Sequence, residues 1–245
     1  MSEPFESDGT EYNRHEARAF LEGLRSRLME RLPDAKELRK AVAALVKSAR
    51  DSSRDRQNAF PEGAFLNRYI YPGLHDYLLY KFSGDKDKAS RAFLSESWRS
   101  LGGMASGTPA RRVLHPFSKA FSGPGQIALQ GAGKCILVQS CPDFALCSPY
   151  KVVFEAKYFQ RGKQDAAVSA LAEGIYQAFF YRGLPKVPQK GKLPPWDYDF
   201  ACFLAGDATD EGYLFKAWEA LDPTVQLGCW EGANVFVMIL WGGKK

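Results

Sequence analysis

The sequence has few of the residues that build a catalytic centre from histidine or cysteine. Its three histidines, at positions 15, 75 and 115, are too widely spaced for the HExxH pattern of zinc hydrolases and make a histidine-based nuclease motif improbable. The five cysteines include no CxxC pair. We therefore predict buried, reduced thiols in strands, with a zinc site as the alternative.

Long apolar runs are also missing. No run reaches the ~18 residues that a membrane span requires. The first residues, MSEPFESDGTEY, are acidic and polar, unlike a signal or transit peptide. The content of 45% hydrophobic and 25% charged residues is typical of a soluble globular protein. We expect a cytoplasmic protein that does not enter a membrane.

The net charge of +5 is modest, but it is unevenly distributed. Residues 81–134 contain nine Lys or Arg and three Asp or Glu, so the remainder of the chain is close to neutral. A basic segment of this kind suits a polyanionic partner, although a run of charge is more often a solvated face.

The first half of the chain favours helices. We predict a tail over 1–12, two helices over 13–50 with a break at Pro33, a polar linker over 51–58, a helix from Pro61 that Pro72 kinks or divides, and a helix over 86–101. Residues 102–133 are rich in glycine, serine and proline, which predicts a long irregular segment.

From Lys134 onward, strand and helix patterns alternate. Strands are predicted over 134–141, 144–147, 150–159, 199–206 and 234–241, and helices over 165–182 and 209–221. The turn at 148–149 folds the strand region that begins at Lys134 back alongside the strand over 150–159. This order predicts an α/β fold with a mixed sheet covered by helices.

One constellation of residues can carry chemistry. Asp143 follows Pro142, and twelve residues later Glu155 and Lys157 share one face of the next strand, because side chains alternate along a strand. Two carboxylates are suitable ligands for Mg²⁺, and a lysine beside them can orient a nucleophile or stabilise negative charge. The alternative is an edge strand whose charges lie in solvent.

This arrangement resembles the motif of the PD-(D/E)xK nuclease superfamily, which includes many restriction endonucleases and recombination and repair nucleases. The resemblance implies a restriction-endonuclease-like αβββαβ core, with a mixed central sheet flanked by helices, over roughly residues 60–205. We accordingly divide the chain into an N-terminal tail and helical extension, 1–58, and a nuclease domain, 59–245. The resemblance also implies hydrolysis of double-stranded DNA with Mg²⁺, for which Mn²⁺ substitutes.

The resemblance extends to further residues. Gln177 and Tyr181 on the following helix are similar to the QxxxY element of the RecB-like branch, where these residues orient the lysine or contact DNA; incidental polar residues on an amphipathic helix are the alternative. Glu62, before the core, is the candidate for a third metal-binding carboxylate, or it only satisfies the helix dipole. The candidate DNA-contacting residues are Arg111, Arg112, Lys119, Lys190 and Lys192.

The first expectation is therefore a type II-like restriction endonuclease, a class that can act as a homodimer. A DNA repair or recombination nuclease of the RecB-like branch is the second. A catalytically inactive DNA-binding module of the same fold is the third, because such a fold can lose its chemistry and keep its partner.

Overall fold

A computed structural model of the 245-residue chain describes residues 14–52, 58–95, 126–131, 134–139, 143–183 and 198–243. The predicted DNA-contacting residues all lie outside these ranges: Arg111, Arg112, Lys119, Lys190 and Lys192.

The chain begins with two long helices, α1 (Arg14–Arg31) and α2 (Ala35–Ser52), as the sequence predicts. Their buried apolar residues belong to the same core as one face of the central sheet. The helices that the sequence assigns to an N-terminal extension therefore share a hydrophobic core with the remainder of the protein.

The next helical segment changes from α-helical to π-helical geometry and back. It consists of α3 (Pro61–Phe65), the π-helical turn η1 (Leu66–Ile70) and α4 (Tyr71–Lys81). Pro72 lies in the first turn of α4, directly after the π-helical turn, and the backbone stays helical through Ile70 and Tyr71. The change of helical geometry falls just before this proline, but the helix is not divided there.

The centre of the fold is a five-stranded mixed sheet with the order β1-β4-β5-β6-β7. Its strands are β1 (Phe93–Ser95), β4 (Phe144–Leu146), β5 (Val152–Phe159), β6 (Phe200–Asp207) and β7 (Val235–Trp241). The β1–β4 and β4–β5 pairs are antiparallel, and the β5–β6 and β6–β7 pairs are parallel. The predicted α/β class is confirmed.

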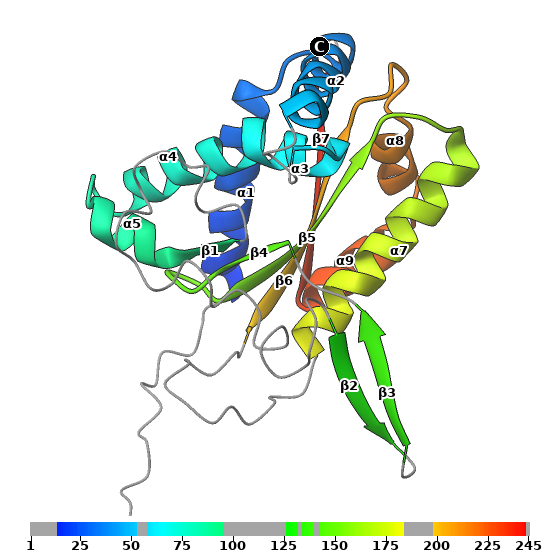
Figure 1. Cartoon of the computed structure of the whole chain (residues 1–245). Coiled ribbons are helices and arrows are strands. Elements are labelled where there is room, and N and C mark those ends of the chain that lie inside the picture. The colour runs from blue at the N-terminus through cyan, green and yellow to red at the C-terminus, as the bar shows by residue number, and fades with distance from the viewer. Residues whose placement is uncertain are drawn as a thin grey trace, which may run out of the picture.

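Helices cover both faces of this sheet, which gives three layers (Figure 1). One face packs against α1, α2, η1 and α4, and alternate residues of β5, among them Phe154, point into that layer. The other face packs against α7 (Gln164–Gly183) and α8 (Tyr213–Glu219). Because β5 is covered on both sides, charged residues in its middle lie in a largely apolar setting.

A separate hairpin corrects two predictions. Strands β2 (Gln126–Gly131) and β3 (Lys134–Gln139) pair with each other and form a two-stranded sheet of their own. The segment from Lys134 therefore does not pair with β5, and residues 126–131 are not irregular. Periodicity alone cannot say which apolar strands pair, and β2 supplies the nearest partner along the chain.

Two helix boundaries also differ from prediction, and one helix was not predicted. The helix predicted over 86–101 is wrong beyond Ala92, because α5 (Lys86–Ala92) ends where Phe93 enters the sheet opposite Leu146. The helix predicted from Thr209 begins four residues later, at Tyr213, and α9 (Pro223–Glu231) was not predicted. The Asp222 cap followed by Pro223 is the local signal that could have revealed α9.

Cys147, Cys202 and Cys229 are free. Cys202 is buried in β6, as predicted, whereas Cys147 is exposed and lies outside the strands, so the prediction is wrong there. Within the parts of the chain that the structure describes, no helix has the length and apolar character needed to cross a membrane.

Candidate active site

The antiparallel register of β4 and β5 brings the two predicted carboxylates together. The ladder of paired residues ends at Phe144 and Phe154, and Asp143 is the residue directly before β4. The negative charge of Glu155 adds to burial in raising the pKa of Asp143, so the two carboxyl groups lie close enough to interact. Asp143 and Glu155 are therefore neighbours at the end of this ladder.

Backbone contacts anchor Asp143 against β5. Its backbone N–H donates a hydrogen bond to the Phe154 carbonyl oxygen over 3.1 Å. Its carboxylate Oδ2 accepts a hydrogen bond from the Ala156 backbone N–H over 2.7 Å. The carboxylate is thus held beside Ala156, the central residue of the Glu155-Ala156-Lys157 motif on β5. Its second oxygen is left for other partners.

Glu155 and Lys157 form an ion pair on the same face of β5. The Lys157 Nζ lies 2.7 Å from the Glu155 Oε1. The Glu155 side chain is only 5% exposed, and that of Lys157 is 28% exposed. The ammonium group therefore opens to solvent while the carboxylate lies beneath it, which contradicts the alternative of an edge strand with both charges in water.

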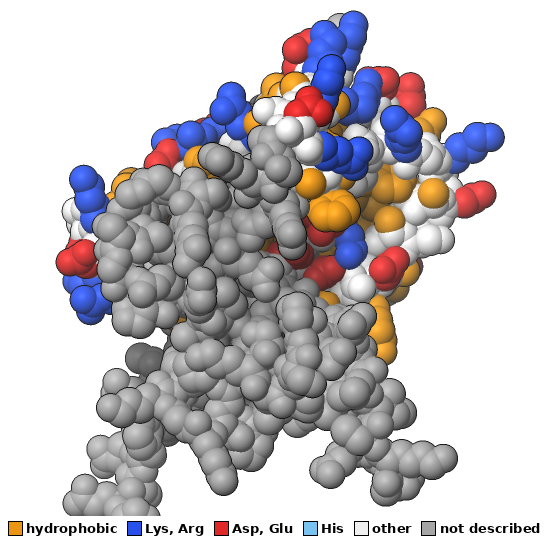
Figure 2. Space-filling view, in the orientation of Figure 1, with side chains coloured by type: hydrophobic (Ala, Val, Ile, Leu, Met, Phe, Trp, Pro, Cys, Tyr) orange, Lys and Arg blue, Asp and Glu red, His pale blue; other side chains and the backbone are white. Residues whose placement is uncertain are grey.

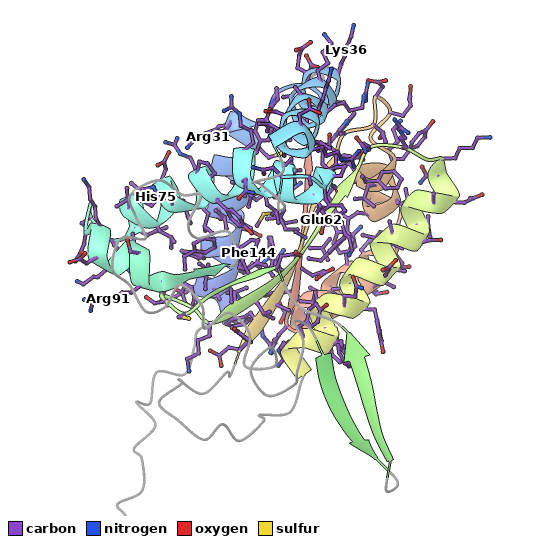
Figure 3. The ribbon with its side chains drawn as sticks, viewed as in Figure 1. Arg31, Lys36, Glu62, His75, Arg91 and Phe144 are labelled. Atoms are coloured by element: carbon purple, nitrogen blue, oxygen red, sulfur yellow. The ribbon has the colours of Figure 1, made fainter. Side chains whose placement is uncertain are left out.

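Glu62 approaches the same site from another element. It stands in the first turn of α3, as predicted, and Figure 3 shows it above the middle of β5. Burial raises the pKa of Glu62 against the opposing charge of Lys157, and Glu62 adds to burial and to Glu155 in raising the pKa of Asp143. Three carboxyl groups and one ammonium group thus interact. Figure 2 shows acidic and basic side chains meeting near the middle of this face.

Burial disfavours the charged forms of all three acids. Burial raises the pKa of Glu62. It also raises the pKa of Glu155 to about 7, against the opposing effect of Lys157. Burial and the charges of Glu155 and Glu62 together raise the pKa of Asp143 well above its usual value. Burial lowers the pKa of Lys157, but the neighbouring carboxylates, with Glu155 foremost, outweigh it and raise that pKa overall. The site carries more acidic groups than its one lysine neutralises.

The helix α7 brings a residue that the sequence did not single out. Glu173 adds a smaller contribution to burial in raising the pKa of Glu155. Glu173 also accepts a 3.3 Å hydrogen bond from the Gln177 side-chain amide. Tyr181 is buried in the core between α7 and the sheet. A signal for Glu173 was present, since it lies one helical turn before Gln177.

The donor set suits a hard cation. Carboxylate oxygens are preferred ligands of Mg²⁺ and Mn²⁺, and the excess of buried acidic groups calls for positive charge. As the side chains stand, however, no three Asp, Glu, His or Cys residues in the described ranges form a group arranged to bind a metal. Lys157 is the cation that partners Glu155 in this arrangement.

Comparison with protein-family models, with curated proteins and with solved structures finds no match to this chain.

Proposed function

We propose that this protein is a metal-dependent nuclease that hydrolyses phosphodiester bonds in double-stranded DNA. The observation that carries the proposal is the placement of the Asp143 carboxylate against β5 beside Glu155, with Lys157 ion-paired to Glu155. A buried strand does not tolerate such charges without compensation, and a site for a cation and a phosphate supplies it.

The topology supports a restriction-endonuclease-like core. Along the chain, helices α3 to α5 precede strands β1, β4 and β5, which are followed by α7 and β6. The three strands are antiparallel neighbours, and β6 joins them in parallel. This is the αβββαβ order that the sequence motif implies, with the hairpin β2–β3 inserted between β1 and β4.

Each site residue has a role in this proposal. Asp143 and Glu155 bind the metal, and Glu62 assists them from α3. A bound Mg²⁺ supplies a Lewis acid for the scissile phosphate and lowers the pKa of a coordinated water. Lys157, released from its ion pair with Glu155, orients the attacking water or stabilises the charge that develops on the phosphate.

The test is cleavage of a supercoiled plasmid by the purified protein. With Mg²⁺ or Mn²⁺ we expect nicked or linear product, and with excess chelator none. Asp143→Asn abolishes cleavage, while Asp87→Asn, which removes an exposed carboxylate on α5 outside the site, leaves it unchanged. Full activity in chelator, or in Asp143→Asn, would contradict the proposal.

The products also separate the two kinds of nuclease. A type II-like restriction endonuclease, our first expectation, yields discrete bands from a defined plasmid. A repair or recombination nuclease of the RecB-like branch degrades DNA progressively. The second kind is favoured by one observation, the position of Gln177 beside Glu173 on the helix that packs against β5.

A non-catalytic DNA-binding module is distinguished by metal titration. If the protein is a nuclease, isothermal calorimetry should detect binding of Mg²⁺ and Mn²⁺ to the unsubstituted protein. The Asp143→Asn variant should show no such binding. Retained DNA binding without metal affinity and without cleavage would replace the catalytic proposal with the binding one.

A further inference from the structure

The position of α7 relative to β5 follows from two hydrogen bonds at one end. The Arg182 Nε donates to the Asp199 carbonyl oxygen over 2.9 Å, and the Asp199 backbone N–H donates to the Lys151 carbonyl oxygen over 3.0 Å. The last turn of α7 therefore lies level with the start of β5. Since the crossover returns to a parallel strand, α7 and β5 run in opposite directions.

This alignment places Glu173 level with Glu155. From Arg182 to Glu173 the helix rises about 14 Å, at 1.5 Å per residue. From Lys151 to Glu155 the strand advances about 13 Å, at 3.3 Å per residue. The electrostatic interaction of Glu173 with Glu155 agrees with this placement.

Gln177 connects Glu173 to the layer between α7 and the sheet. Helical side chains lean toward the helix N-terminus, so the Gln177 amide leans back toward the level of Glu173. Its Nε2 donates to the Glu173 Oε1 over 3.3 Å. A carboxylate only accepts hydrogen bonds, which means that the amide must turn its NH₂ group toward Glu173 and its carbonyl oxygen away.

That carbonyl oxygen needs a donor. The Gln177 Oε1 is buried and has no hydrogen-bond partner among the described residues. A buried unpaired acceptor is costly, so a ligand or water is expected to complete it. A phosphate oxygen cannot donate a hydrogen bond to the Gln177 Oε1, because it is itself an acceptor. A water molecule can donate one.

We propose that Glu173 is a positioning residue, which holds the Gln177 amide so that its carbonyl oxygen accepts a hydrogen bond from a water at the Asp143–Glu155 site. The inference rests on the proposed nuclease function, and it assigns Glu173 a part in orienting water rather than in binding DNA. No bond to the substrate forms at Glu173.

The first test compares two substitutions of Glu173 in the full chain. Glu173→Ala removes the acceptor, so we expect kcat to fall about 10- to 100-fold, the usual effect of losing a residue that orients a ligand from outside the metal's own shell. In the same variant, KM and the affinity for DNA, measured with Ca²⁺ in place of Mg²⁺, are expected to remain unchanged. Glu173→Gln keeps an acceptor oxygen and restores kcat to within about threefold of the original value.

Two further variants complete the series. Asp165→Ala removes the other acidic side chain of α7, two turns away, and is expected to leave kcat unchanged. Gln177→Glu presents a second carboxylate to Glu173 and is expected to lower kcat at least as much as Glu173→Ala, since the two groups repel.

A measurement without DNA provides an independent readout. The side-chain amide signals of Gln177 in ¹H–¹⁵N spectra are assigned by their loss in Gln177→Leu. We expect the amide protons to shift upfield in Glu173→Ala, where their acceptor is gone, and to move during a Mg²⁺ titration of the unsubstituted protein.

The outcomes separate this inference from the proposed function. If the unsubstituted protein cuts no DNA with any divalent metal, the nuclease proposal fails, and this inference fails with it. If it cuts DNA and Glu173→Ala has the same kcat, or Glu173→Gln is as defective as Glu173→Ala, only the positioning role is overturned. Unmoved Gln177 amide signals in Glu173→Ala overturn it as well.

Discussion

Asp143 lies beside Glu155 at the end of the β4–β5 ladder, directly before the stacked rings of Phe144 and Phe154. The Asp143 Oδ2 accepts a hydrogen bond from the Ala156 N–H over 2.7 Å, so both carboxylates lie at one place on β5 and can share a cation with oxygen bonds of about 2.0–2.6 Å. A slip of one residue between β4 and β5 would separate Asp143 from the Ala156 N–H and from Glu155. The aromatic pair beside the site therefore helps to specify it.

Replacement of Lys157 by alanine is expected to lower kcat for DNA cleavage by about 10²–10³-fold, the usual effect of losing a group that stabilises developing charge. DNA binding, measured with Ca²⁺ in place of Mg²⁺, should change little, because one partly buried ammonium contributes modestly to a polyanion interface. Plasmid cleavage and fluorescence anisotropy measure the two effects. An enzyme that binds DNA poorly but turns over normally would show that Lys157 contacts the substrate instead.

Glu155→Gln is expected to stabilise the metal-free protein at neutral and alkaline pH. Burial raises the pKa of Glu155 from 4.5 to about 7, so the folded state holds a proton that the unfolded state releases between these values. Stability is therefore lost as pH rises through this window, and the variant avoids a loss of about 1–3 kcal/mol above pH 7.

Urea unfolding in chelator at several pH values between 4 and 8 checks this. The difference in unfolding free energy between the variant and the unsubstituted protein should be near zero below pH 4.5 and largest above pH 7. Glu219→Gln, at an exposed position of α8, should show no such trend. A constant difference across the range would contradict the assigned shift.

Asp207 is expected to be a major determinant of stability, although it lies outside the site. Its fully buried carboxylate accepts hydrogen bonds from the backbone and hydroxyl of Thr209 and from the backbone N–H groups of Leu214 and Phe215 at the start of α8. Asp207→Ala leaves these donors unpaired and should cost about 2–4 kcal/mol.

The exposed cap Asp222 of α9 is the matched control for Asp207. It accepts from the Thr224 backbone N–H over 2.7 Å, and Asp222→Ala should destabilise the protein clearly less than Asp207→Ala does. Thermal unfolding followed by circular dichroism measures both variants. Equal effects would mean that burial adds nothing to the Asp207 cap.

Gly174→Ala is expected to destabilise the protein by about 1–3 kcal/mol, the range for overpacking a core. A Cβ atom at this position of α7 would overlap the ring of Phe203, which is completely buried in β6. Since Glu173 is the preceding residue, the same change should displace it and lower nuclease activity.

Gly228→Ala in α9 is the corresponding control, because a Cβ there meets no other atom within 4 Å. That substitution should stabilise the helix by about 0.5–1 kcal/mol. A stabilising effect at Gly174 would show that α7 can move away from the sheet.

The sequence by itself determined which side chains share a face. Alternation along β5 places Glu155 and Lys157 together, helical spacing places Gln177 and Tyr181 on one side of α7, and the helix signals at Pro61 locate Glu62 in a first turn. These are local periodicities, which is why they are readable from one segment at a time.

Tertiary structure decided which segments meet. Pairing of β3 with β2, entry of Phe93 into the sheet and the contact of Asp143 with β5 depend on long-range register, which competing apolar strands leave open in the sequence. The same holds for Glu173, whose proximity to Glu155 comes from how α7 packs across β5. Burial then sets the pKa of each acid, because desolvation exists only once the layers close.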